Sequence, residues 1–85
     1  MNKLIVSTAQ WCSTCKPYKQ VLLELDTSNY DIVFVDVDTA SKVQLLDLKI
    51  RGVPTTILQD SEGNEIKRNT GAMSLQQIKQ WLEGV

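Results

Sequence analysis

Apolar residues along this chain of 85 residues form short unbroken runs in some segments and recur at helical spacing in others. Residues 3–7 and 31–37 carry unbroken, β-branched apolar runs, which are typical of strands buried on both faces, as in parallel sheets. Between them, from Ser13 to about Asp26, the apolar spacing is that of a helix, which residues 27–29 end. A strand, a helix and a strand in this order predict a βαβ unit.

The second half of the chain predicts one more helix, two strands and a final helix. Thr39 is expected to cap a helix over residues 40–48, with Val43 and Leu46 on one face and Leu45 and Leu48 beside them. A loop over residues 49–54 leads to a strand at 55–58. Turn-forming residues 60–64 then precede a polar strand at 65–69, which fits an exposed sheet edge protected by Lys67 and Arg68.

The last helix has a recognisable N-terminal signature. Ser74 followed three residues later by Gln77 is a capping box. Leu75, Ile78 and Leu82 predict the inner stripe of this helix, and Met73 and Trp81 are expected to pack in or near the core.

Size and composition limit the possible classes. We expect one domain over residues 1–85. A hydrophobic content of 42% and a net charge of −1 do not fit a disordered chain or a basic nucleic-acid-binding surface. No apolar run approaches the roughly 20 residues of a membrane span. The apolar run near Met1 is too short for a signal peptide, so a cytoplasmic location is expected, and a mature form that has lost its signal peptide stays open.

Both cysteines of the chain, Cys12 and Cys15, lie in the stretch Trp11-Cys12-Ser13-Thr14-Cys15-Lys16. Their spacing places both side chains on one helix face, where they can form a disulfide or two neighbouring thiols. If Cys12 opens the helix, unpaired backbone N–H groups and the helix dipole favour its thiolate. Cys15, one turn inside, is expected to stay protonated until needed. One sulfur would attack and the other would resolve the mixed disulfide.

The cysteine pair has three other interpretations. Two small buried apolar residues would not explain the flanking Trp11 or the position before a helix. A zinc or iron–sulfur site usually needs four ligands, and this chain has two cysteines and no histidine, so no metal site is expected. A structural disulfide closing so short a loop would restrain little of the unfolded chain.

Three blocks of residues resemble the thioredoxin family: Trp11 to Lys16 as an active-site motif, Arg51-Gly52-Val53-Pro54-Thr55 as the loop with a cis-proline, and Asn69-Thr70-Gly71-Ala72-Met73-Ser74 as the glycine segment before the last helix. The resemblance implies an α/β fold of the order β-α-β-α-β-β-α. Its four-stranded mixed sheet would have the strands at 31–37, 3–7, 55–59 and 65–69 in that order. The first and last helices would cover one face and the middle helix the other. Family members usually begin with a further strand and helix.

The resemblance also implies site residues. A cis Val53–Pro54 bond would bring the proline ring against the sulfurs and turn the Val53 backbone outward, where a client segment could pair with it; a plain turn is the alternative. Gly71, followed by Ala72, would let a client backbone approach, unless it is a simple turn glycine. Trp11 would form an apolar wall beside Cys12, or merely pack.

Other residues of the motifs are expected to support the site. Ser13, Thr14 and Gly52 complete the active-site and proline loops. Lys16, Lys19 and Arg51 could add positive potential near the thiolate, or be solvated. The family's buried aspartate, six residues before the first cysteine, is Val6 here, and Ser13-Thr14 replaces the common Gly-Pro.

The function implied is a thiol–disulfide oxidoreductase that reduces disulfides of client proteins through Cys12 and Cys15. We expect no cofactor beyond this redox-active pair, a monomer, and an electron donor of the thioredoxin-reductase type. A glutathione-linked glutaredoxin-type reductase and a non-catalytic binding subunit with this fold are the alternatives.

Overall fold

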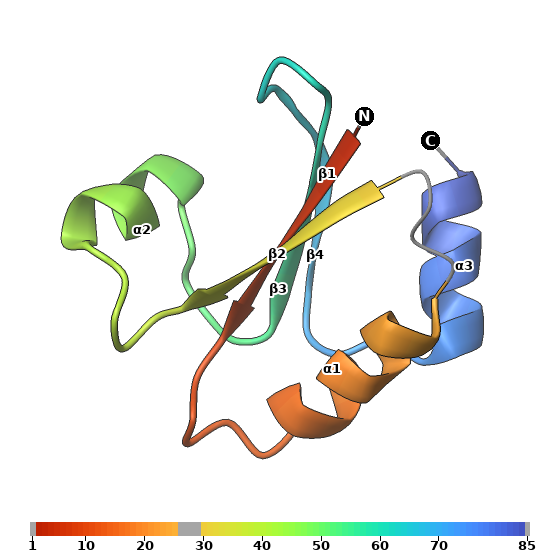
Figure 1. Cartoon of the computed structure of the whole chain (residues 1–85), viewed down its shortest axis with the longest axis horizontal. Coiled ribbons are helices and arrows are strands. Elements are labelled where there is room, and N and C mark those ends of the chain that lie inside the picture. The colour runs from red at the N-terminus through yellow and green to blue at the C-terminus, as the bar shows by residue number, and fades with distance from the viewer. Residues whose placement is uncertain (1, 26–29, 85) are drawn as a thin grey trace.

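The computed structural model describes residues 2–25 and 30–84, which form a mixed sheet flanked by helices (Figure 1). The predicted order β-α-β-α-β-β-α is confirmed. The elements are β1 (Asn2–Thr8), α1 (Cys15–Glu24), β2 (Tyr30–Asp36), α2 (Lys42–Leu48), β3 (Thr55–Gln59), β4 (Glu65–Thr70) and α3 (Leu75–Glu83). The predicted end of the first helix, at Asp26 and residues 27–29, lies outside the described residues.

The four strands follow the predicted order β2-β1-β3-β4. β1 pairs in parallel with β2 and antiparallel with β3, and β3 pairs antiparallel with β4. Asp60 shapes the turn between β3 and β4, because its carboxylate accepts hydrogen bonds from the backbone N–H groups of Glu62 and Asn64, each at 2.9 Å. These bonds, foremost those from Asn64, lower the pKa of Asp60.

Alternating residues of β1 supply two separate cores. Leu4 and Val6 point to one face, where they meet residues of α1 and α3 such as Leu22 and Ile78. Ile5 points to the other face, where its cluster packs against residues of α2. The predicted placement of α1 and α3 on one face and α2 on the other is therefore confirmed (Figure 1).

One prediction about α2 is wrong, and the sequence pattern did not decide which of its faces is buried. Its N-cap is Ser41, whose hydroxyl accepts the N–H of Gln44, whereas Thr39 belongs to a turn that bonds back to Asp36. Val43 and Leu46 are 68% and 74% exposed, and it is Leu45 and Leu48 that pack against the sheet. Four of the seven residues of α2 are apolar and they lie on more than one side of the helix. Their spacing alone therefore does not show which face is buried.

The remaining elements agree with their sequence patterns. The capping box of Ser74 and Gln77 is present, and Ile78 and Leu82 are buried. β4 is the predicted polar edge. The Lys67 ammonium donates to the Trp81 carbonyl of α3. Arg68 donates hydrogen bonds to backbone carbonyls at the end of α2. It also binds Glu65 at 2.5 Å, and this hydrogen bond lowers the pKa of Glu65.

None of the helices in the described part of the chain is long and apolar enough to cross a membrane.

Candidate active site

The cysteine motif lies in the turns that connect β1 to α1. The Cys12 N–H donates to the Ala9 carbonyl at 3.2 Å, and the Cys15 N–H donates to the Cys12 carbonyl at 3.3 Å. These two bonds wind the chain into a turn just before the helix. Cys12 and Cys15 are joined by a disulfide, and their Cα atoms are 5.4 Å apart. The spacing that suggested a redox pair therefore brings the two sulfurs together.

The expectation that Cys12 opens the helix is wrong. α1 begins at Cys15, and its N-cap residue is Thr14, so Cys12 precedes the helix by one turn. The Cys12 sulfur instead lies 3.5 Å from the Thr14 hydroxyl. In the disulfide form the two cysteines are about equally buried, at 7% and 4% exposure. Exposure alone therefore does not separate an attacking sulfur from a resolving one.

Trp11 lies on the surface, next to the disulfide. It is 69% exposed, so it is not a core packing residue. Its indole Nε1–H donates to a carboxylate oxygen of Asp38 at 3.1 Å, which holds the exposed ring in place. Asp38 was not predicted as a site residue. Asp38 lies just after β2, which runs parallel to β1, and parallel strands end at the same edge of a sheet. This position could have indicated that Asp38 lies near the cysteine motif.

The loop before β3 reaches the cysteines from the other side. Val53 packs against the cluster of Ala9, Cys12 and Cys15. The Val53–Pro54 peptide bond is cis, and Pro54 is buried.

A buried serine on β1 holds this loop. The Ser7 hydroxyl accepts the Thr55 N–H at 2.8 Å and donates to the Gly52 carbonyl at 3.1 Å. Sequence reasoning missed Ser7, which lies inside an apolar strand and gives no signal of its own there.

The third block, around Gly71, joins the same site. The Gly71 N–H donates to the Pro54 carbonyl at 2.8 Å, so the glycine segment is tied directly to the proline loop. Gly71 has a φ of 102°, which favours glycine, and a Cβ built there would meet nothing within 4 Å. The next residue, Ala72, is exposed. The three blocks that lie apart in the sequence are thus linked, because Val53 packs against the cysteines and Gly71 is bonded to the neighbouring Pro54.

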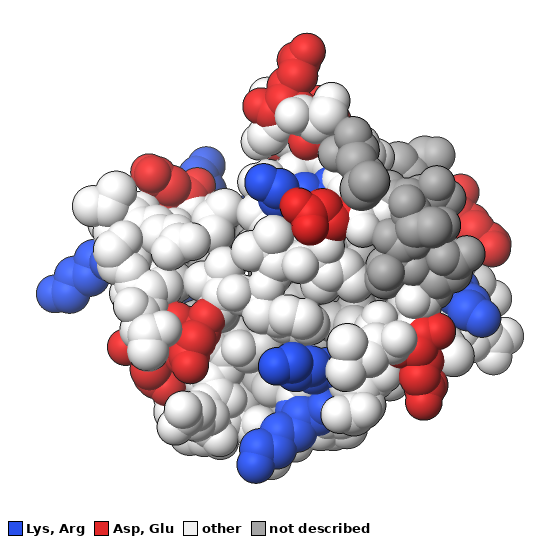
Figure 2. Space-filling view, viewed as in Figure 1, with Lys and Arg blue, Asp and Glu red and all other residues white. Residues whose placement is uncertain are grey.

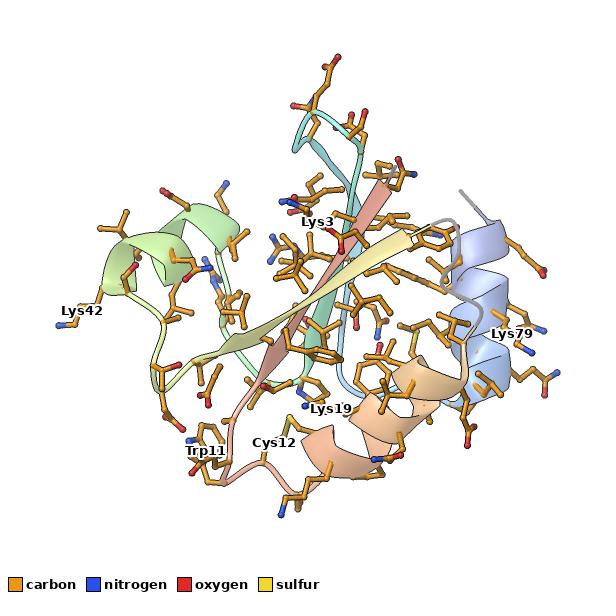
Figure 3. The ribbon with its side chains drawn as sticks, in the orientation of Figure 1. Lys3, Trp11, Cys12, Lys19, Lys42 and Lys79 are labelled. Atoms are coloured by element: carbon orange, nitrogen blue, oxygen red, sulfur yellow. A yellow bond between two sulfur atoms is a disulfide. The ribbon has the colours of Figure 1, made fainter. Side chains whose placement is uncertain are left out.

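A small hollow beside Cys15 is lined in part by charged residues. It has a volume of about 210 Å³, and Lys16, Lys19 and Asp36 are among its lining residues. The Lys19 ammonium lies 4.9 Å from the centroid of the Phe34 ring. Figure 3 shows Trp11, Cys12 and Lys19 at the same end of the molecule, far from Lys42 and Lys79. Lys16 and Lys19 therefore lie close to the cysteine motif.

Arg51 lies elsewhere. It lines a different hollow, together with Lys49, Glu65 and Arg68, and it does not line the hollow beside Cys15. Its expected contribution to the potential at the cysteines has no support in the geometry.

Comparison with known families agrees with this arrangement. A family model described as a thioredoxin-like domain matches residues 2–85. The chain belongs to the thioredoxin-like family. No curated protein sequence matches it significantly.

Solved structures of thioredoxins share the fold. A mutant thioredoxin from Halobacterium salinarum has a TM-score of 0.85 and 24% identity, covering 98% of this chain and 73% of its own. Oxidised thioredoxin O2 from Arabidopsis thaliana has a TM-score of 0.83 and 23% identity, covering 100% and 75%. Thioredoxin-2 of the malaria parasite, described as a component of its protein secretion machinery, has a TM-score of 0.85 and 16% identity, covering 100% and 84%.

One position of this thioredoxin-like site differs from the expected family pattern. Val6, where the resemblance leads us to expect a buried aspartate, has no exposed surface and lies in the core shared with α1 and α3. Its cross-strand partner is Thr56, whose hydroxyl hydrogen-bonds the Tyr18 hydroxyl. Burial raises the pKa of Tyr18, although the bond to Thr56 partly opposes this. The chain therefore has a neutral hydroxyl pair beside this position.

Proposed function

We propose that this protein reduces disulfide bonds of other proteins by thiol–disulfide exchange at Cys12 and Cys15. The observation that carries the proposal is the linkage of three sequence blocks to one disulfide: Trp11 precedes Cys12, Val53 packs against the cysteine cluster, and Gly71 is hydrogen-bonded to Pro54. We infer that an extended client segment binds over this surface.

In the reaction, the Cys12 thiolate attacks one sulfur of a client disulfide. The Cys12–client bond forms, the client disulfide breaks, and the second client sulfur leaves as a thiolate. The Cys15 thiolate then attacks the Cys12 sulfur, which forms the Cys12–Cys15 disulfide and releases the first client sulfur. Two electrons pass from the protein to the client, whose two thiolates take up protons. A dithiol or a reductase of the thioredoxin-reductase type would then reduce the protein again.

The assignment of Cys12 as the attacking sulfur follows from its neighbours. Cys12 directly follows the exposed Trp11, which belongs to the proposed client surface. The Thr14 hydroxyl, 3.5 Å from the Cys12 sulfur, can donate a hydrogen bond to a thiolate there. Cys15 begins α1 and lines the hollow on the side of Lys16 and Lys19.

Client recognition would use backbone groups more than side chains. The Val53 backbone and the open side of Gly71 can accept an extended segment, because a client strand pairs with main-chain groups and needs no particular sequence. The exposed Trp11 ring would cover apolar parts of that segment.

Lys16 and Lys19 would assist the second step. Both residues line the same hollow as Cys15, where Asp36 supplies one opposite charge, and a net positive charge near a sulfur favours its thiolate. This field would partly replace the carboxylate that is absent at Val6. The hollow also gives water a route to the proton that Cys15 must lose.

The decisive experiment follows the reduction of a disulfide-bonded protein with dithiothreitol as the electron source. We expect the native chain to accelerate reduction many-fold, and Cys12→Ser to abolish this acceleration while the fold is retained by circular dichroism. Unchanged acceleration by Cys12→Ser would refute the proposal and favour a binding role. Regeneration by thioredoxin reductase with NADPH, compared with glutathione, then separates a thioredoxin from a glutaredoxin-type enzyme.

A further inference from the structure

A hollow of about 590 Å³ lies between the end of α2 and the strands β3 and β4. Across these two strands Arg68 pairs with Ile57, and Ile57 packs in the core beneath α2. The hollow is therefore on the α2 side of the sheet, opposite the side that α1 and α3 cover. Its lining residues are Lys49, Arg51, Thr55, Glu65, Arg68 and Thr70.

This hollow carries a local excess of positive charge. Three of its six lining residues are cationic and one is acidic, which leaves a formal charge of +2. The whole chain, in contrast, has a net charge of −1. On the face of the molecule seen in Figure 2, lysine and arginine side chains are scattered among acidic ones. We call this local concentration of cations the basic hollow.

The one carboxylate of the basic hollow is already bound. The Arg68 guanidinium donates to both carboxylate oxygens of Glu65, from Nε at 2.9 Å and from Nη2 at 2.5 Å. Within residues 2–25 and 30–84 this is the only ion pair, so the charges of Lys49 and Arg51 have no carboxylate partner there. These two cations can therefore bind an anion from outside the chain.

Arg68 also fixes the backbone on this side of the basic hollow. It donates to the carbonyls of Leu48 and Lys49, at 2.7 Å and 3.0 Å, and so ties the end of α2 to β4. The Ile50 N–H donates back into the helix at 3.1 Å. The chain that leads to Arg51 is therefore held in place before any ligand binds, which lowers the entropy lost on binding.

The basic hollow adjoins the proposed client surface. Thr55, which lines the hollow, directly follows Pro54. Thr70, which also lines it, directly precedes Gly71, and the Gly71 N–H donates to the Pro54 carbonyl at 2.8 Å. Figure 1 shows the loop that contains Arg51 running from α2 to the end of the sheet where β3 begins and β4 ends. A client segment bound on the proline loop can therefore extend over the hollow.

We propose that the basic hollow binds carboxylate side chains of the client, so that the protein prefers disulfides with aspartate or glutamate nearby. Lys49 and Arg51 form ion pairs with these carboxylates, and the exposed Thr70 can donate a hydrogen bond from its hydroxyl. An acidic peptide segment fits better than a single small anion, because the hollow is larger than one carboxylate and continues into the client surface. The inference rests on the proposed function and names the class of client that the site selects.

The first test measures binding in the absence of any exchange reaction. The oxidised native chain is titrated with a hexapeptide of alternating glutamate and glycine, and the backbone amide shifts are followed by NMR. We expect the shifts to concentrate on residues 49–51 and 68–70. Arg51→Gln should weaken binding about two- to fivefold, which is the range for one exposed ion pair.

Lys42→Gln is the matched control, because it removes the same charge from the start of α2, outside the basic hollow. It should leave binding of the hexapeptide unchanged. Equal weakening by the two variants, or shifts spread evenly over the chain, would overturn the proposal. Stronger binding of inorganic phosphate than of the hexapeptide at residues 49–51 would also overturn it.

The second test compares the reduction of two disulfide-bonded peptides that carry either glutamate or glutamine beside the disulfide. With dithiothreitol as the electron source, we expect kcat/KM of the native chain to be about fivefold higher for the glutamate peptide. Arg51→Gln should bring the two values closer, whereas Lys42→Gln should keep the native ratio. Equal kcat/KM values for the native chain would overturn this inference and leave the proposed function intact. If neither peptide is reduced, the proposed function fails, and the binding test alone decides whether the hollow holds acidic segments.

Discussion

The Ser7 hydroxyl is the side chain whose removal should most directly loosen the proline loop. In Ser7→Ala the buried Thr55 N–H loses its hydrogen-bond acceptor, which lies at 2.8 Å in the native chain. An unsatisfied buried donor costs about 1–3 kcal/mol. The Gly52 carbonyl keeps a bond from the Thr55 hydroxyl at 2.7 Å, so the loss of its bond from Ser7 adds little. We therefore expect a loss of about 2 kcal/mol in the free energy of unfolding.

For a chain of this size, such a loss lowers the melting temperature by roughly 8–16 °C. The free energy is measured by urea unfolding, with Ser61→Ala, the same change in an exposed turn, as the control. Because Ser7 positions the backbone of residues 52–55, client reduction below the melting temperature should also slow. A Ser7→Ala protein that matches the Ser61→Ala control in both stability and rate would refute the reasoning about this loop.

Three further predictions concern the core and the hollow beside Cys15. Val6→Asp should speed the release of a client from a preformed mixed disulfide near pH 7 and cost about 2–3 kcal/mol of stability, since it buries an ionisable group; identical release rates and pH profiles in the two proteins would show that another group already takes the proton. Lys19→Met should slow the same release about threefold, an effect that high salt should reduce, whereas Lys79→Met on α3 should not; a slowing shared by both variants would contradict the role of the hollow. Burial raises the pKa of Tyr18, so the native chain should lose stability as the pH rises above about 10, where the unfolded chain ionises first. Tyr18→Phe should be about 1–2 kcal/mol less stable at pH 7 but should lose less on going to pH 11, as urea titrations at both values would show; a steeper loss in the variant would disprove this account.

Much of this fold could be predicted from local patterns. The unbroken apolar run of β2 and the capping box at Ser74 identify their elements because each is a short-range feature. α2 was harder, since its four apolar residues leave the buried face undecided and only contact with Ile5 and Ile57 selects Leu45 and Leu48.

The site was predictable where it depends on motif spacing and hidden where it depends on tertiary contacts. Cys12, Pro54 and Gly71 came from the three blocks. Ser7 and Asp38 did not, because their roles arise from hydrogen bonds between segments far apart in the chain. The start of α1 at Cys15 was also missed, since the turn closed by the Cys12 carbonyl has the same local spacing as a helical turn.

The most direct test of the proposed mechanism is mass spectrometry of the Cys15→Ser protein after reaction with a disulfide-bonded client. The mechanism predicts one covalent adduct per chain, linked through Cys12, that persists until a reducing agent is added, whereas Cys12→Ser forms none. An adduct that accumulates on Cys12→Ser and not on Cys15→Ser would reverse the two roles. The absence of any adduct on either variant would contradict disulfide exchange as the function of this site.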